Sequence, residues 1–305
     1  MSEDNGKTAG SGELDGKDIE LRASDGYTLA ATFYESAQAR GVVVISAANG
    51  IKQSYYASFA RYLAEHGFAA LTYDYRGIGG SRRGPLKHSG ATFSDWGKLD
   101  LSAALEGARS LVTAPLLTVG HSAGAQLLGL AQRVGEVRGA IAVGAGMGTW
   151  WRVTGPDRFK GALLMYALIP FTTRLLGYFP SRALKLGEDL PAGVAREWMR
   201  WARHSEYFAG HLSAQELAGY QHLRAPWLSI NATDDHIASP ANVAALCARY
   251  PNARVSAVRV SPAEVGRAAL GHVGWFARGG AEKLWPTALD FLERCVAQPQ
   301  QDAVQ

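Results

Sequence analysis

The fold is decided by one stretch, Pro115 to Leu128, which reads Pro-Leu-Leu-Thr-Val-Gly-His-Ser-Ala-Gly-Ala-Gln-Leu-Leu. An apolar run of strand length leads into a Gly-x-Ser-x-Gly pattern, and residues with helical spacing follow at once. This order is typical of a nucleophile elbow, a tight turn that holds a serine hydroxyl clear of the surface. Gly120 and Gly124 favour such a turn, because the strand and helix backbones pass too close there for side chains. We therefore predict that Ser122 is a nucleophile.

Apolar runs of strand length recur on both sides of the elbow, separated by segments with helical spacing. This alternation predicts an α/β fold with a mostly parallel sheet and helices on both faces. An Asp-Gly pair at 25–26 predicts that the fold opens with a hairpin. The expected strands are 19–23, 28–34, 42–45, 68–73, 116–119, 140–143, 226–230 and 255–260. The expected helices begin at about Ser54, at Ser94 as the N-cap, after Ser122, at Pro240 and at about Ala281.

The alternation of strands and helices stops between residues 149 and 222. This segment is rich in aromatic residues and is interrupted by Pro156, Pro170, Pro180 and Pro191, so it cannot be a single helix. We expect a helical cap inserted after the sixth strand. The predicted organisation is a loosely ordered tail 1–15, a core 16–148, the cap 149–222, the second part of the core 223–297 and a loosely ordered tail 298–305.

Composition and charge argue against several classes of protein. Hydrophobic residues make up 47% of the 305 and charged residues 19%, as in ordinary soluble globular proteins. The formal net charge of +4 comes from scattered Lys and Arg residues, so no nucleic-acid partner is expected. Cys247 and Cys295 lie far apart in the sequence, which fits a reducing compartment better than a disulfide framework. The polar N-terminus lacks the apolar part of a signal peptide, so we expect a cytoplasmic location.

Residues 161 to 180 are apolar enough to raise the question of a membrane span. Pro170 breaks this segment and Arg174 would lie within the bilayer, so we expect no transmembrane segment. Association of the segment with a membrane surface stays open. Its aromatic side chains are expected to pack the cap, and some of them to line an apolar acyl pocket.

A serine nucleophile needs a base of near-neutral pKa, and the base needs an acceptor that fixes its tautomer. Both are expected at the carboxyl ends of later strands, where ligands gather in such sheets. Asp235 is favoured as the acceptor over its neighbour Asp234. His272 is favoured as the base, because it follows the last strand within a glycine-flanked loop. His236 is the rival, but it stands next to its own carboxylate and would struggle to reach Ser122 as well.

An oxyanion hole needs two N–H donors aimed at the oxygen of the tetrahedral intermediate. We expect Ala123, directly after the nucleophile, to supply one donor and Ile51, in the loop after the strand 42–45, to supply the other. His121 is expected to support the elbow. The sequence contains no His-Glu-x-x-His pattern, and its glycine runs do not complete Gly-x-Gly-x-x-Gly. We therefore expect no metal site and no bound dinucleotide.

Several motifs together resemble the α/β-hydrolase superfamily over about residues 17 to 297, and most closely a branch of bacterial predicted α/β-hydrolases of poorly defined substrate. These motifs are Asp74-Tyr75-Arg76-Gly77 with Ser81, Gly120-His121-Ser122-Ala123-Gly124, Leu176-Gly177-Tyr178-Phe179-Pro180 and Gly271-His272-Val273-Gly274-Trp275-Phe276. The resemblance implies an α/β-hydrolase fold, a triad of Ser122, Asp235 and His272, a cap over the site and no cofactor. The sequence departs from the family pattern at Asn49-Gly50, where many members have His-Gly, and at His236, where proline is common.

These observations predict a serine hydrolase of the carboxylesterase type, acting on a small-molecule ester or thioester with an apolar acyl group. Two alternatives stay open. The same triad would serve an acyltransferase, and an idle triad would leave a binding or scaffold protein. The sequence identifies neither the natural substrate nor the oligomeric state, and a homo-oligomer is one of the states it allows.

Overall fold

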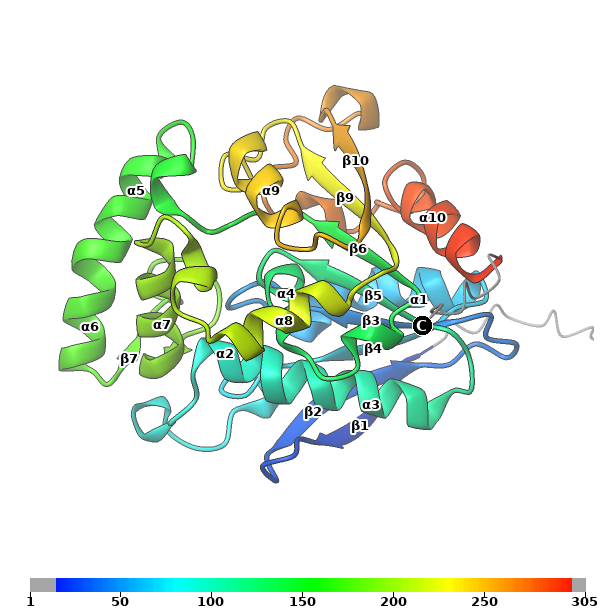
Figure 1. Ribbon diagram of the computed structural model, residues 1–305, viewed down its shortest axis with the longest axis horizontal. Coiled ribbons are helices and arrows are strands. Elements are labelled where there is room, and N and C mark those ends of the chain that lie inside the picture. The colour runs from blue at the N-terminus through cyan, green and yellow to red at the C-terminus, as the bar shows by residue number, and fades with distance from the viewer. Residues whose placement is uncertain (1–14, 298–305) are drawn as a thin grey trace, which may run out of the picture.

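The computed structural model describes residues 15–297, which form an eight-stranded sheet with helices on both faces (Figure 1). The strand order is β1-β2-β4-β3-β5-β6-β9-β10. β2 pairs antiparallel with β1 and β4, and the other neighbouring pairs are parallel, as predicted. The strands are β1 Lys17–Arg22, β2 Thr28–Tyr34, β3 Val42–Ser46, β4 Ala69–Tyr73, β5 Leu116–His121, β6 Gly139–Val143, β9 Pro226–Ala232 and β10 Arg254–Val260. Apart from Asp15, the two predicted tails lie outside the described residues.

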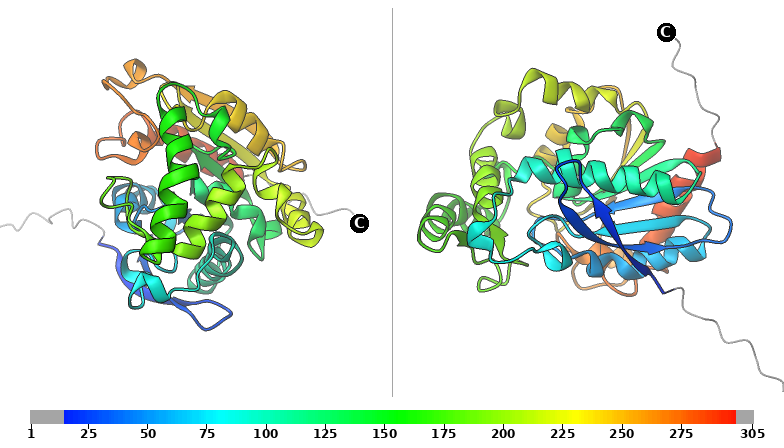
Figure 2. Two further views of the ribbon diagram at one scale, coloured as in Figure 1. Left: turned by 90° about the vertical axis from the view of Figure 1, so that its left-hand side faces the viewer. Right: turned by 90° about the horizontal axis from the view of Figure 1, so that it is seen from below.

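The four central strands are buried at every position, which requires cover on both faces of the sheet. Helices α1 (Ala57–Glu65) and α10 (Trp285–Ala297) cover one face, and α3 (Ser102–Leu111) lies on the other (Figure 2, right). The rings of Phe59 on α1 and Trp285 on α10 meet edge to face at 5.4 Å. The core therefore continues from the sheet into the contact between these two helices.

The remaining helices complete the two layers and the inserted segment. They are α2 Phe93–Asp95, α4 Ala123–Gln126, α5 Asp157–Leu163, α6 Ile169–Leu175, α7 Ala192–Ala202, α8 Ala214–His222 and α9 Pro240–Cys247. A 3-10 turn, Gln53–Tyr56, precedes α1, and π-helical turns occupy Trp96–Leu101 and Leu164–Leu168.

Two predicted helix starts were wrong. Ser94 is not an N-cap, because a capping box between Thr92 and Asp95 starts the helix two residues earlier. Ser94 lies inside the first turn, where its amide and hydroxyl donate to the carboxylate of Glu197 on α7. The last helix begins at Trp285 rather than near Ala281, with proline as its second residue, a position at which a missing N–H costs nothing.

Between β6 and β9 the chain leaves the sheet. There α5, a π turn and α6 run on as one helix, and a two-strand ladder of β7 (Tyr178–Phe179) with β8 (Leu190–Pro191) leads into α7 (Figure 1). The last helix of this segment, α8, returns to the core, where the hydroxyl of Tyr220 donates to the carbonyl of Gln126. Among residues 15–297, no helix is both long and apolar enough to cross a bilayer.

A buried arginine just after β4 joins three parts of the core by ion pairs and a hydrogen bond. Arg76 forms ion pairs of 2.7 Å with both Asp25, in the β1–β2 turn, and Asp100, on the π-helical turn before α3. Its backbone carbonyl accepts from the indole N–H of Trp96. The hairpin, the sheet and the α3 layer are therefore locked together just beyond the carboxyl end of a central strand.

Candidate active site

The structure forms a strained elbow at Ser122, between β5 and α4. The backbone of Ser122 has φ 49° and ψ −108°, a conformation that residues with a side chain rarely adopt. A Cβ on Gly120 would collide with the backbone of Ala125, and a Cβ on Gly124 would collide with the carbonyl of Ser46 on β3. The amide of Ser122 donates to the carbonyl of Val143 at 2.9 Å, which fixes the elbow to β6. The glycine spacing in the sequence thus has the steric cause that we predicted.

The hydroxyl of Ser122 lies at one end of a line of three polar side chains. Nε2 of His272 is 3.0 Å from Oγ of Ser122, and Nδ1 of His272 is 2.8 Å from Oδ2 of Asp235. The three residues follow β5, β9 and β10, so the parallel sheet delivers them to the same edge. A neutral imidazole in this position donates from Nδ1 to the carboxylate and accepts from the serine at Nε2.

The carboxylate of Asp235 is buried but well supplied with donors. Its Oδ1 accepts from the amides of Ile237 and Ala238 at 2.9 and 3.0 Å. Burial alone would raise the pKa of Asp235, but the hydrogen bond and charge of His272, together with these two amides, lower the pKa below its usual value. Asp235 is therefore an anion at neutral pH and can stabilise a protonated imidazole.

The two rivals named from the sequence lie elsewhere. Oδ2 of Asp234 accepts from the amide of Leu270 at 2.9 Å, so this aspartate holds the histidine loop rather than the imidazole. His236 is half-buried, and its Nδ1 lies 3.4 Å from a carboxylate oxygen of Asp157 in the inserted segment.

The loop that carries His272 is fixed at three successive points. The first point is the amide of Leu270, which donates to Asp234. The second is the carbonyl of His272, which accepts from Nε2 of His121 at 2.9 Å, and the third is the carbonyl of Val273, which accepts from the hydroxyl of Tyr55 at 2.8 Å. His272 is therefore held by its own backbone as well as by Asp235. Preorganisation of this kind removes the entropy cost of orienting the base during reaction.

His121 links the elbow to this loop and to the loop after β3. Nε2 of His121 must donate to a carbonyl, so Nδ1 is the acceptor. Nδ1 accepts a hydrogen bond from the hydroxyl of Tyr56, with 2.8 Å between the nitrogen and the oxygen. The oxygen of Tyr56 in turn accepts from the amide of Ala48 at 2.9 Å. Complete burial lowers the pKa of His121 to about 3, so the ring stays neutral and keeps this tautomer.

Of the two oxyanion donors predicted from the sequence, the structure favours one. Ala123 is the first residue of α4, so its N–H has no acceptor within the helix and directly follows Ser122. The amide of Ile51 instead donates to the carbonyl of Ala48 at 3.1 Å and is not free for a ligand. The cause is a turn over 48–51 whose third residue, Gly50, has φ 73°. Ile51 would have to give up this bond to serve as the second donor.

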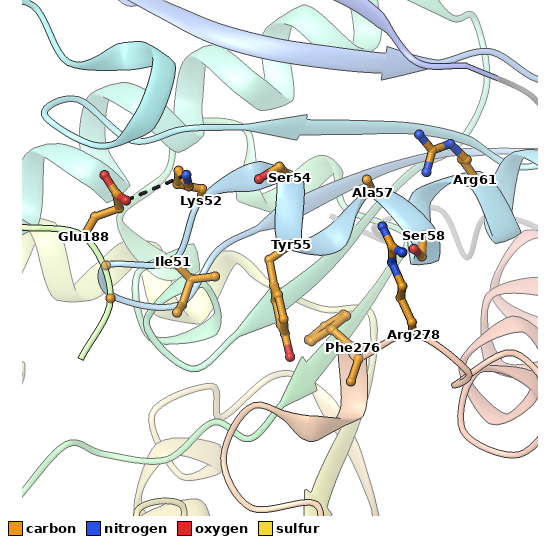
Figure 3. Close-up of a pocket in the computed structure, with 13 residues that line it drawn as sticks. Ile51, Lys52, Ser54, Tyr55, Ala57, Ser58, Arg61, Glu188, Phe276 and Arg278 are labelled. Atoms are coloured by element: carbon orange, nitrogen blue, oxygen red, sulfur yellow. Dashed lines mark ion pairs between the residues drawn. The ribbon is translucent and has the colours of Figure 1, made fainter. Parts of the chain in front are cut away.

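A pocket of about 560 Å³ opens beside this loop (Figure 3). Ile51 and Tyr55 line it from the loop and the 3-10 turn, and Phe276 lines it from the segment that follows His272. At its rim, Glu188 of the inserted segment lies 3.9 Å from the ammonium group of Lys52. The lining residues do not include Ser122 or His272, so this pocket adjoins the elbow without containing either residue.

Three residues of the site have contacts that were not predicted from the sequence. The hydroxyl contact of Tyr56 with His121 has no local signal in the sequence. Asp234 was treated as a competitor of Asp235 rather than as an anchor of the histidine loop. Gly144 follows β6, and a Cβ there would lie 3.1 Å from the carbonyl of His272 and 3.4 Å from Oδ2 of Asp235. The glycine run after β6, with its positive φ of 55°, was the available signal for this close approach.

A mostly parallel sheet that presents a serine elbow, an aspartate and a histidine at one edge defines a protein of the α/β-hydrolase class. A family model described as the alpha/beta hydrolase family matches residues 42–282, and the chain belongs to this family. The resemblance inferred from the motifs is thereby confirmed. No curated protein sequence matches the chain.

Several solved structures share the fold at low sequence identity. The esterase Pf2001 of Pyrococcus furiosus has a TM-score of 0.60 and 16% identity over 92% of this chain and 91% of its own. The alpha/beta hydrolase GrgF of Penicillium sp. sh18 has a TM-score of 0.58 and 21% identity over 93% of this chain and 100% of its own. A bacterial membrane phospholipase A has a TM-score of 0.56 and 15% identity over 93% and 88%. At these identities the comparison establishes the shared fold.

The depressed pKa of His121 predicts a specific dependence of stability on pH. Between the ordinary value of 6.5 and about 3, the unfolded chain binds a proton at this histidine that the folded protein does not bind. The free energy of unfolding should therefore fall as the pH falls below 6.5. From pH 7 to pH 5, wild type should lose about 2 kcal/mol more than a His121→Gln variant, measured by urea unfolding.

The exposed His66, the C-cap residue of α1, offers the matched control. A His66→Gln variant should follow the wild-type pH dependence, because this residue is not buried. Equal pH dependence in wild type and His121→Gln would show that His121 is not held neutral by burial.

Proposed function

We propose that the protein is a serine hydrolase that cleaves a carboxylic ester or thioester through an acyl-enzyme on Ser122. The observation that carries the proposal is the continuous line from the hydroxyl of Ser122 through the ring of His272 to the carboxylate of Asp235, with contacts of 3.0 and 2.8 Å. Membership of the alpha/beta hydrolase family supports it. The activity proposed is that of a carboxylesterase.

In the first half-reaction, Oγ of Ser122 attacks the carbonyl carbon of the substrate while Nε2 of His272 takes the hydroxyl proton. The electron pair of the carbonyl moves to its oxygen, which becomes the oxyanion of a tetrahedral intermediate. The N–H of Ala123 is the donor placed to stabilise that charge. When the intermediate collapses, the bond to the alcohol or thiol breaks, and this leaving group receives the proton from His272.

In the second half-reaction, His272 takes a proton from a water molecule, whose oxygen attacks the carbonyl carbon of the acyl-enzyme. When the second tetrahedral intermediate collapses, the bond between its carbon and Oγ of Ser122 breaks, Oγ receives the proton from His272, and the carboxylic acid is released. Asp235 remains ionised throughout and stabilises the imidazolium twice in each cycle. No further group is needed to balance either half-reaction.

The substrate class proposed is a small molecule with an apolar acyl group. In this proposal residues 149–222 act as a cap over the site. Two contacts join them to the core. Glu197 accepts from the amide of Ser94, and the amide of Glu188 donates to the carbonyl of Gly50 at 2.7 Å. The second of these contacts joins the inserted segment to the loop beside the oxyanion site. We further propose a cytoplasmic location.

A fluorophosphonate probe tests the nucleophile. The probe should label wild type at a single residue, and Ser122→Ala should lose labelling entirely, because the attacking oxygen is gone. Ser110→Ala, at an exposed serine of α3, should label like wild type. Labelling that persists in Ser122→Ala, measured by intact-protein mass spectrometry, would assign the reactive oxygen to another residue.

Two neighbouring aspartates test the role of the acid. Asp235→Asn should lower kcat on a nitrophenyl ester by roughly 10³- to 10⁴-fold, because an amide in this place favours the wrong tautomer of His272. Asp234→Asn should cost less than about tenfold, since an amide oxygen can still accept from the amide of Leu270. Equal losses in the two variants would contradict the assignment of Asp235.

A further inference from the structure

The outermost helix of the inserted segment exposes a row of large apolar side chains. Segment 157–175 is continuous through α5, the π turn and α6, and every fourth residue along it is apolar and exposed. We call this row the outer stripe; it consists of Phe159, Leu163, Ala167, Phe171 and Leu175. The exposed fractions of its four large members are 79%, 57%, 68% and 69% in that order. Few soluble surfaces carry four such side chains in one row.

The π-helical turn explains why these residues share one face. In an α-helix a step of four residues overshoots a full turn of 3.6 residues, so a row with this spacing would drift around the helix. The turn Leu164–Leu168 lies at the middle of the row, and a π turn holds more residues than an α turn. It therefore cancels part of the drift, and the residues of α5 and α6 stay in line.

The opposite side of the same helix is also apolar, and it is buried. Met165, Ile169 and Thr173 are almost fully buried, and the guanidinium of Arg196 on α7 donates to the hydroxyl of Thr173 at 3.0 Å. A helix that is apolar on all sides is normally covered on all sides. Here one side packs on the protein, and the helix itself lies at the edge of the molecule that faces the viewer in Figure 2 (left).

The charges around the outer stripe identify what covers it. Segment 157–175 carries three basic residues, Arg158, Lys160 and Arg174, and one acidic residue, Asp157, which forms an ion pair of 2.8 Å with Lys160. The basic residues flank the stripe at both of its ends. Pairing with a second copy, in either direction, would bring basic ends together, which opposes self-association.

From this combination we propose that the outer stripe docks on an anionic lipid surface. The apolar side chains enter the boundary between head groups and acyl chains, while the basic residues meet the phosphates of anionic lipids. The helix lies in the plane of the interface and does not cross it, because Pro170 and Arg174 oppose a span. The contact between Ser94 and Glu197 ties α7, and with it this helix, to the core, so docking fixes the orientation of the whole molecule.

Vesicle flotation tests this proposal without any measurement of hydrolysis. Full-length protein is mixed with vesicles of phosphatidylcholine containing 30 mol% phosphatidylglycerol, and in parallel with phosphatidylcholine alone. Wild type should float with the anionic vesicles and much less with the neutral ones. Phe171→Ser combined with Leu175→Ser should weaken binding at least about tenfold, because two large apolar groups no longer enter the lipid.

Three controls separate the proposal from its rivals. Leu111→Ser, at an exposed leucine of α3 outside the stripe, should bind like wild type. Arg158→Gln with Arg174→Gln should weaken binding to anionic vesicles by about fivefold for each charge removed. For Phe171→Ser with Leu175→Ser, thermal unfolding and fluorophosphonate labelling unchanged from wild type would show that the fold is intact.

Three results would overturn the proposal. The first is equal flotation of wild type with both kinds of vesicle, or flotation with neither. The second is that the variant Phe171→Ser with Leu175→Ser floats like wild type. The third is light scattering that shows a dimer for wild type and a monomer for Phe171→Ser with Leu175→Ser. This result would assign the stripe to the interface with a second copy. None of these results bears on the reactivity of Ser122, so docking and hydrolysis can fail separately.

Discussion

The site depends on how closely the helix after Ser122, α4, approaches the neighbouring strand β3. Gly124 on α4 lies so near the carbonyl of Ser46 on β3 that any side chain would push the two apart. This approach allows the chain to turn within one residue and forces Ser122 into its strained conformation, φ 49° and ψ −108°. The strain is offset by the buried strands on either side and by the bond from Ser122 to Val143. A wider turn would carry the hydroxyl away from His272.

Around the elbow, buried polar groups convert this local constraint into a preorganised site. His121 sits between the hydroxyl of Tyr56 and the carbonyl of His272, so one neutral ring ties the loop after β3, the elbow and the histidine loop together. Each of its nitrogens has one partner of the right kind, which is what makes complete burial tolerable. The buried carboxylate of Asp235 is likewise satisfied. The backbone amides of Ile237 and Ala238, together with His272, offset the cost of burying its charge.

The parts of the protein that could be predicted from sequence are those with a local cause. Apolar runs separated by helical segments specify the parallel sheet, and strand ends specify the edge at which Ser122, Asp235 and His272 meet. Ser94 was wrong as a cap because the stronger signal, the capping box that begins at Thr92, was passed over. The contacts of Tyr56 and the close approach at Gly144 depend on residues distant in sequence, and no local pattern reports them. The turn at Gly50 that engages the amide of Ile51 did have a local signal, the Asn-Gly pair.

The central claim is that the oxygen of Ser122 forms a covalent bond with the acyl group of the substrate. The most direct measurement is rapid acid quenching of wild type during turnover of a nitrophenyl ester, followed by peptide mapping with mass spectrometry. The account predicts a mass increase equal to one acyl group on the peptide that contains Ser122. An acyl group on another peptide, or turnover with no acylated peptide at any quench time, would contradict it.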